Sequence, residues 1–152
     1  MTEPIRAALE RLLQNHIEAE NAHRMEATLA TLHPDCRFED VATGQIFNGR
    51  AGAEAYYRQW WDAFGVTVAP GPDRKRYWSE DGSYIAEARF RGRHSGDFLG
   101  LPPTGRPIDF RFVVIIDFRD GLMAGERFYY DLGGLLRQIG AAALPEPVKE
   151  SA

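Results

Sequence analysis

The stretch that decides the fold is Pro107–Arg119 (PIDFRFVVIIDFR), which is followed by Asp120-Gly121 and by the run Leu122–Tyr130. Apolar side chains occupy every second position of the first run and therefore share one face of a strand: Ile108, Phe110, Phe112, Val114, Ile116 and Phe118. An Asp-Gly pair between two such runs is typical of a tight hairpin turn. The region thus predicts a long antiparallel hairpin whose apolar face must be covered by other elements.

Outside this hairpin the chain alternates between helical and extended patterns. Further strands are expected at residues 36–40, 45–47, 66–69, 75–79 and 84–93, and helices at 4–20, 24–32, 48–64 and 132–139. We predict an α+β fold in which a curved antiparallel sheet wraps around the N-terminal helices as a cone with an interior pocket. A single domain should span residues 1–142, followed by a tail at 143–152 in which two prolines oppose helix formation.

Length and composition place the chain among ordinary globular domains. Its 152 residues are 44% hydrophobic and 26% charged, which is enough for one domain with its own core. The formal net charge of −4 argues against a nucleic-acid-binding protein, which would carry a basic excess. No apolar run reaches the ~18–20 residues of a membrane span, and the start lacks the apolar segment of a secretory signal. We expect a cytoplasmic protein that binds neither nucleic acid nor membranes.

The residue types that usually hold metals give little indication of a metal site. Cys36 is the only cysteine, which excludes an internal disulfide and a cysteine-based zinc cluster. The tripeptide His33-Pro34-Asp35 is similar to half of a two-histidine, one-carboxylate iron site, but a helix end followed by a turn explains it better. We therefore predict no metal.

Three polar residues stand where apolar neighbours are expected. Asp40 shares its strand face with Phe38, and Asp131 follows the aromatic run Phe128–Tyr130. A carboxylate among aromatic rings loses hydration and becomes a useful base near neutral pH. Each also has a structural interpretation, Asp40 as a residue that binds its own turn and Asp131 as the N-cap of the last helix. His16 lies on the apolar stripe of the first helix, either as a satisfied core histidine or as a donor that points into the cone.

Several motifs resemble those of one family. They are Gly96–Arg106 with its Pro102-Pro103-Thr104-Gly105-Arg106 loop, Asp120-Gly121-Leu122, Arg127-Phe128-Tyr129-Tyr130-Asp131, and Leu135-Leu136-Arg137-Gln138-Ile139-Gly140. These segments resemble the SnoaL-like polyketide cyclases, also called ester cyclases, of the nuclear-transport-factor-like superfamily. Residues 35–57, with Phe38-Glu39-Asp40 and Asn48-Gly49-Arg50, are similar to the front half of that superfamily.

The resemblance implies a cystatin-like α+β roll that is usually dimeric and that works without metal or cofactor. It further implies ring closure by intramolecular aldol condensation, with Asp131 at the position of the acid and base. The ketosteroid isomerases share the superfamily, and Asp40 matches their base. Their two oxyanion donors fall near His16 and near Val113–Ile115, which are different residue types here, so an isomerase would need an oxyanion hole built differently.

We therefore predict an enzyme that removes a proton next to a carbonyl group in a dry pocket, as a cyclase acting on a hydrophobic small molecule. His16 or Arg127 would contact the substrate oxygen. The pocket walls are expected from aromatic residues: Tyr56, Trp60, Trp78, Phe112, Phe128 and Tyr129. The alternatives are a non-catalytic small-molecule-binding protein of the same fold and an isomerase or epoxide hydrolase-like enzyme.

The other face of the sheet predicts a homodimer contact. Ile85, Val113 and Ile115 lie on it between charged side chains, and solvent-exposed aliphatic residues of this kind are typical of an interface. A two-fold axis would bury these aliphatic residues and pair the opposite charges around them, namely Arg89, Arg91, Asp109, Arg111, Asp117 and Arg119.

Overall fold

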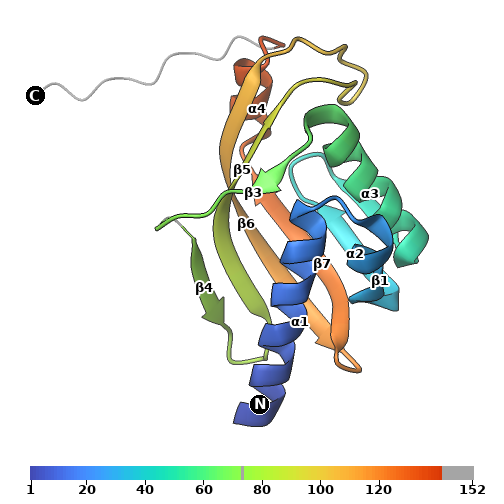
Figure 1. Cartoon of the computed structure of the whole chain (residues 1–152), viewed down its shortest axis with the longest axis vertical. Helices are drawn as coiled ribbons and strands as arrows, with labels where there is room; N and C mark the ends of the chain where they lie inside the picture. Colours follow the sequence, from blue (N-terminus) through green and yellow to red (C-terminus); the bar gives the residue numbers. More distant parts are fainter. Residues whose placement is uncertain (73, 142–152) are drawn as a thin grey trace, which may run out of the picture.

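The computed structural model describes residues 1–72 and 74–141 (Figure 1). Within these residues the chain forms α1 (Glu3–Asn21), α2 (Met25–Ala30), β1 (Leu32–Asp40), β2 (Gln45–Asn48), α3 (Gly49–Phe64), β3 (Thr67–Val68), β4 (Lys75–Trp78), β5 (Tyr84–Arg93), β6 (Pro107–Arg119), β7 (Leu122–Tyr130) and α4 (Leu132–Gln138). The predicted tail at 143–152 and the domain boundary at 142 lie outside the described residues.

The strands form one curled sheet that does not close on itself. Their order is β2-β1-β7-β6-β5-β3, and β4 also pairs with β5. The predicted hairpin of β6 and β7 is confirmed, and it turns at Asp120 and Gly121 with φ of 53° and 74°, as an Asp-Gly hairpin turn requires. The sheet is mixed rather than purely antiparallel, because β1 pairs with β7 in parallel.

Helices α1, α2 and α3 cover the concave face of this sheet, which confirms the predicted α+β arrangement (Figure 1). The alternation of β6 places five side chains on that face, all buried: Ile108, Phe110, Phe112, Val114 and Ile116. Helix α3 presents Tyr56, Tyr57, Trp60 and Phe64 to them. Each fully buried side chain of this size contributes about 1.5–3 kcal/mol, so these two elements dominate the core.

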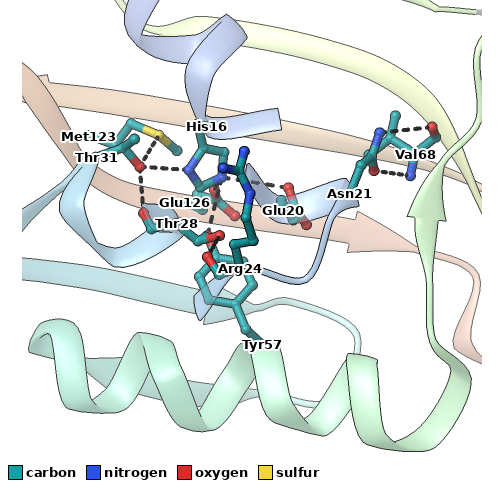
Figure 2. Close-up of polar contacts among 10 residues, drawn as sticks. All are labelled: His16, Glu20, Asn21, Arg24, Thr28, Thr31, Tyr57, Val68, Met123 and Glu126. Atoms are coloured by element: carbon teal, nitrogen blue, oxygen red, sulfur yellow. Dashed lines mark hydrogen bonds and ion pairs between the residues drawn. The ribbon is translucent and has the colours of Figure 1, made fainter. Parts of the chain in front are cut away.

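The C-terminal end of α1 is fastened to the short strand β3 by one side chain. The amide of Asn21 accepts from the backbone N–H of Val68 at 2.8 Å and donates to the Val68 carbonyl at 3.4 Å (Figure 2). His23 adds a bond between its Nε2 atom and the Val66 carbonyl at 2.7 Å. These bonds hold the C-terminal end of α1 against β3 and the residues just before it.

The boundary between the second helix and the first strand differs from the prediction. Helix α2 ends at Ala30 rather than continuing to residue 32, and β1 begins at Leu32 and includes Pro34. Proline cannot donate a strand hydrogen bond, and the pairing of β1 with β7 shifts its register between Leu32 and Arg37. The Arg50 guanidinium donates two hydrogen bonds to the Leu32 carbonyl, at 2.6 and 3.0 Å. These bonds satisfy a backbone acceptor at the irregular start of the strand.

Candidate functional site

The curled sheet and α1 enclose a narrow cavity whose neighbouring parts share lining residues. We call these parts the mouth, the chamber and the inner chamber. The mouth, about 240 Å³, lies between α1 and the start of β4 and includes Arg74 and Trp78. The chamber, about 60 Å³, is walled by phenylalanine rings that include Phe112 and Phe128. The inner chamber, about 20 Å³, is lined by Tyr56, Tyr57, Trp60, Phe90 and Phe128 together with two glutamates.

Five of the six predicted wall residues border this cavity, whereas Tyr129 and the predicted donor Arg127 do not. Tyr56 and Trp60 line the inner chamber, Phe112 and Phe128 the chamber, and Trp78 the mouth. Arg127 and Tyr129 lie on the opposite face of β7, because strand alternation turns them away from Phe128. Arg127 there pairs with Asp117 at 3.1 Å, and Tyr129 is 41% exposed.

Four polar side chains from three elements meet where the chamber joins the inner chamber (Figure 2). The Nε2 atom of His16, on α1, lies 3.5 Å from Glu20 Oε2 and 3.8 Å from Glu126 Oε1. Tyr57 points up from α3, and its hydroxyl oxygen lies 3.3 Å from the same nitrogen. His16 is 3% exposed, and the two glutamate side chains are 15% and 12% exposed.

Hydrogen bonds fix the tautomer of His16. The Thr31 hydroxyl donates to the Thr28 carbonyl at 2.7 Å, so its oxygen accepts from His16 Nδ1 at 2.7 Å. Desolvation lowers the pKa of His16 from 6.5 to about 4. The ring is therefore neutral at physiological pH, with its proton on Nδ1, and Nε2 accepts from the Tyr57 hydroxyl. His16 orders the site without carrying charge, which favours the core interpretation over the donor interpretation.

Glu20 and Glu126 are the two carboxylates that line both the chamber and the inner chamber, and Arg74 also lines the chamber. Burial raises the pKa of Glu20 from 4.5 to about 7. Burial, and then the neighbouring charge of Glu20, raises the pKa of Glu126 to about 8. Within residues 1–72 and 74–141, neither carboxylate accepts a hydrogen bond and neither pairs with a cationic lysine or arginine. Near neutral pH the pair holds about one proton, so it provides a base and an acid at the same place.

Sequence reasoning missed Glu20, Glu126 and Tyr57, although the spacing contains a signal for each. Glu20 follows His16 by four residues and so shares its helix face. Glu126 precedes Phe128 by two residues and so shares its inward strand face. Tyr57 belongs to the predicted aromatic stripe of α3. A charged residue in register with an apolar period is the pattern that would have found both glutamates.

Asp40 is buried but does not line the cavity. Its Oδ2 atom accepts from the hydroxyls of Tyr56 and Tyr130 at 2.9 and 3.0 Å, and its Oδ1 atom accepts from the Thr43 backbone N–H at 2.9 Å. Thr43 belongs to the turn between β1 and β2, so the predicted bond to its own turn is present. Three donors satisfy this carboxylate, and it holds Tyr56 and Tyr130 in place beneath the inner chamber.

Asp131 is the N-cap of α4. Its Oδ1 atom accepts from the Gly134 backbone N–H at 2.9 Å, as the capping interpretation predicts. The residue is exposed and does not line the cavity. Strand alternation explains why Asp131 does not face the cavity. Glu126, Phe128 and Tyr130 point inward, and Asp131 lies beyond the end of β7.

The described part of the chain contains neither a metal-binding cluster nor a membrane-spanning helix. Residues 1–72 and 74–141 contain no group of three or more His, Cys, Asp or Glu side chains arranged to hold a metal ion. Among the same residues, no helix is both long enough and apolar enough to cross a membrane.

Comparison with known proteins places this chain in a family. The SnoaL-like polyketide cyclase model matches residues 10–139. A protein assigned as a polyketide cyclase from Xanthomonas campestris pv. campestris is 24% identical, with 90% of this chain and 99% of that one covered and a TM-score of 0.78. TsrD from Streptomyces laurentii is 28% identical, with 90% and 98% covered and a TM-score of 0.75.

A protein of ketosteroid isomerase-like fold from Catenulispora acidiphila is 20% identical, with 90% and 97% covered and a TM-score of 0.71. The search of functionally curated proteins gave no match. Because the family match spans most of the chain, the protein belongs to the SnoaL-like polyketide cyclase family.

Proposed function

We propose that the protein catalyses proton transfer next to a carbonyl group, leading to intramolecular aldol ring closure, on a small apolar carbonyl compound. One observation carries this proposal: Glu20 and Glu126, two partly exposed carboxylates with pKa values raised to about 7 and about 8, face one apolar cavity. A general base works best when its pKa lies near the operating pH. Ordinary surface glutamates are far too acidic for this role.

In the proposed reaction the ionised carboxylate of the pair takes a proton from the carbon next to the carbonyl group. The C–H electron pair moves into the enolate, whose carbon then attacks a second carbonyl carbon of the same molecule. The new alkoxide receives a proton from the protonated carboxyl of the pair. No proton or electron is gained or lost overall, so the residues of this chain suffice for the chemistry.

The cavity limits which part of the substrate can enter. Sites for drug-sized ligands usually measure ~300–1,000 Å³, whereas the chamber and inner chamber measure about 60 and 20 Å³. We propose that only the reacting end of the substrate reaches Glu20 and Glu126, and that the remainder lies in the mouth between α1 and Trp78.

The test is deuterium exchange at the carbon next to the carbonyl of cyclopentanone in heavy water, followed by proton NMR. The wild type should catalyse the exchange, and Glu126→Gln should abolish it while preserving the shape of the side chain. Glu18→Gln is the matched control, because Glu18 lies exposed on the same helix as Glu20 and does not face the cavity. Undiminished exchange in Glu126→Gln contradicts the proposal, and a ligand-binding protein without catalysis would show no exchange in any variant.

A water-activating hydrolase is a second candidate, favoured by the same pair of carboxylates. One carboxylate could remove a proton from water while the other protonates an epoxide oxygen. Incubation of cyclohexene oxide in ¹⁸O-labelled water separates the two chemistries, because only the hydrolase incorporates the label into a diol.

A further inference from the structure

We propose that Arg74 and Arg76 bind a carboxylate group of the substrate at the mouth of the cavity, so that the substrate is an apolar keto acid. The carboxylate stays at the mouth while the carbonyl end of the same molecule reaches Glu20 and Glu126. This orientation of the substrate rests on the proposed function, whereas the anion site itself rests on the residues of the mouth alone.

Both arginines lie on the side of β4 that borders the cavity. Arg74 directly precedes β4, and Arg76 and Trp78 follow at intervals of two residues, the spacing that turns side chains of an extended chain to one side. All three line the mouth. Arg74 is half-buried and also lines the chamber, so it lies where the two parts meet. Across the mouth is α1, where Glu10 Oε1 accepts from Trp78 Nε1 at 3.3 Å (Figure 1).

The hydroxyl group of Tyr84 shows where the two guanidinium groups lie. Tyr84 pairs with Trp78 across β4 and β5 and lines both the mouth and the chamber. Burial raises the pKa of Tyr84, and the positive charges of Arg76 and Arg74 act against that rise. Both charges are therefore near a side chain that lines the cavity.

The positive charge of the mouth is not neutralised by the described residues. Within residues 1–72 and 74–141 neither Arg74 nor Arg76 forms an ion pair with a carboxylate, in contrast to the arginines of the outer sheet face. Among the described residues that line the mouth, Glu10 supplies the negative charge, and it accepts from Trp78. Two arginines and one glutamate leave one formal positive charge, which a single carboxylate neutralises.

The shape and lining of the cavity indicate an acid with an apolar body. A guanidinium group binds a carboxylate through two parallel N–H···O bonds. The mouth, about 240 Å³, has room for this group, because one water occupies only ~30 Å³ in the liquid. The chamber beyond it offers apolar side chains such as Leu13 and Ile17. Deeper still, the negative charge of the Glu20–Glu126 pair repels an anion, so the charged end of a ligand remains at the mouth.

The test compares two probes of the same shape, 3-cyclopentylpropanoate and its neutral amide, 3-cyclopentylpropanamide. Calorimetric titration at about pH 7.5, where the acid is ionised, measures both affinities. We expect the wild type to bind the acid about 10-fold or more tightly than the amide, as hydrogen bonds to a charged group provide. Added sodium chloride should weaken the binding of the acid and leave that of the amide unchanged.

The double variant Arg74→Gln/Arg76→Gln should lose the preference for the acid. Its matched control is Arg11→Gln/Arg24→Gln, which removes the same charge from two exposed arginines that line none of the three parts of the cavity. The control should prefer the acid as strongly as the wild type does. A loss of preference in both double variants would mean that overall charge, and not this site, attracts the acid, and it would overturn the inference.

The inference is also overturned by equal affinity of the wild type for the two probes, by no measurable binding of the acid, or by an undiminished preference in Arg74→Gln/Arg76→Gln. Its failure is distinguishable from failure of the proposed function, because the probes carry no ketone and their binding requires no catalysis. A preference for the acid without any cyclopentanone exchange would refute the proposed reaction and support the anion site. Exchange without that preference would do the reverse.

Discussion

Replacing Glu126 by glutamine is expected to stabilise the protein in mildly alkaline solution. Burial raises the pKa of Glu126 from 4.5 to about 8, so between these pH values the folded chain keeps a proton that the unfolded chain releases. Because the folded state binds more protons there, the free energy of unfolding of the wild type falls as the pH rises. Glutamine resembles the protonated carboxyl in shape and does not titrate, so the variant should lack this fall.

The size of the effect follows from the two pKa values of Glu126. At ~1.4 kcal/mol per pH unit for one proton, the full rise corresponds to about 5 kcal/mol as an upper limit. His16 acts in the opposite direction, because its pKa is lowered from 6.5 to about 4, so its destabilising effect at low pH disappears as the pH rises past 6.5. Above pH 6.5 the contribution of His16 levels off, so the interval from pH 6.5 to 8 reports chiefly on the carboxylates, and there the Glu126 proton accounts for about 2 kcal/mol.

Urea unfolding followed by tryptophan fluorescence at about pH 6.5 and about pH 8.5 measures this difference. The wild type should lose stability between the two conditions, Glu126→Gln should lose clearly less, and the exposed control Glu18→Gln should follow the wild type. Parallel loss of stability in the wild type and in Glu126→Gln would refute the reasoning. It would mean that Glu126 is ionised in the folded state, and the proposed base would then have no elevated pKa.

Three further predictions concern other parts of the molecule. Asp131→Asn should retain thermal stability and cyclopentanone exchange, whereas Asp131→Ala should lose about 0.5–2 kcal/mol of stability; loss of exchange in Asp131→Asn would move the base to the position that the family resemblance indicates. Asp40→Asn should lower stability in urea unfolding by roughly 1.5–3 kcal/mol, because the Tyr56 and Tyr130 hydroxyls would no longer donate to a charged acceptor. We also propose a homodimer through the outer sheet face, so sedimentation at micromolar concentration should show dimers for the wild type and monomers for Ile115→Asp.

The dimer prediction now rests on the apolar residues of that face, because its charges pair within the chain. Asp109 binds Arg89 and Arg91 at 2.7 and 3.1 Å, and Arg111 lies 3.4 Å from Glu87. These ion pairs need no partner subunit. Val113 and Ile115 remain partly exposed between them, and an interface would bury them.

The sequence predicts the fold well where one local pattern decides it. Alternation along Pro107–Arg119 and the Asp120-Gly121 turn specify the central hairpin, because strand periodicity and turn geometry act between neighbouring residues. The parallel pairing of β1 with β7 was not predicted, since it joins residues about 90 positions apart. Nothing in the sequence of either strand identifies its partner or its direction.

The candidate site was harder to predict than the fold for a related reason. Glu20 and Glu126 each stand beside other polar residues in the sequence, and only the meeting of α1 with β7 makes them neighbours. Asp131 was predicted from its position after an aromatic run, but the inward face of β7 ends one residue earlier, at Tyr130. A shift of one residue on a strand reverses the face, so a prediction at a strand end depends on a register that the sequence does not fix.

Asp40 and Glu126 show why inward position alone does not identify a base. Both carboxylates lie inside the curled sheet, on the adjacent strands β1 and β7. Asp40 accepts three hydrogen bonds, which commit it to holding two tyrosines. Glu126 accepts none among the described residues; desolvation first, and then the neighbouring acid Glu20, disfavour its charge, so a proton binds near neutral pH. The first arrangement stabilises the fold, and the second leaves a carboxylate ready to exchange a proton with whatever enters the chamber.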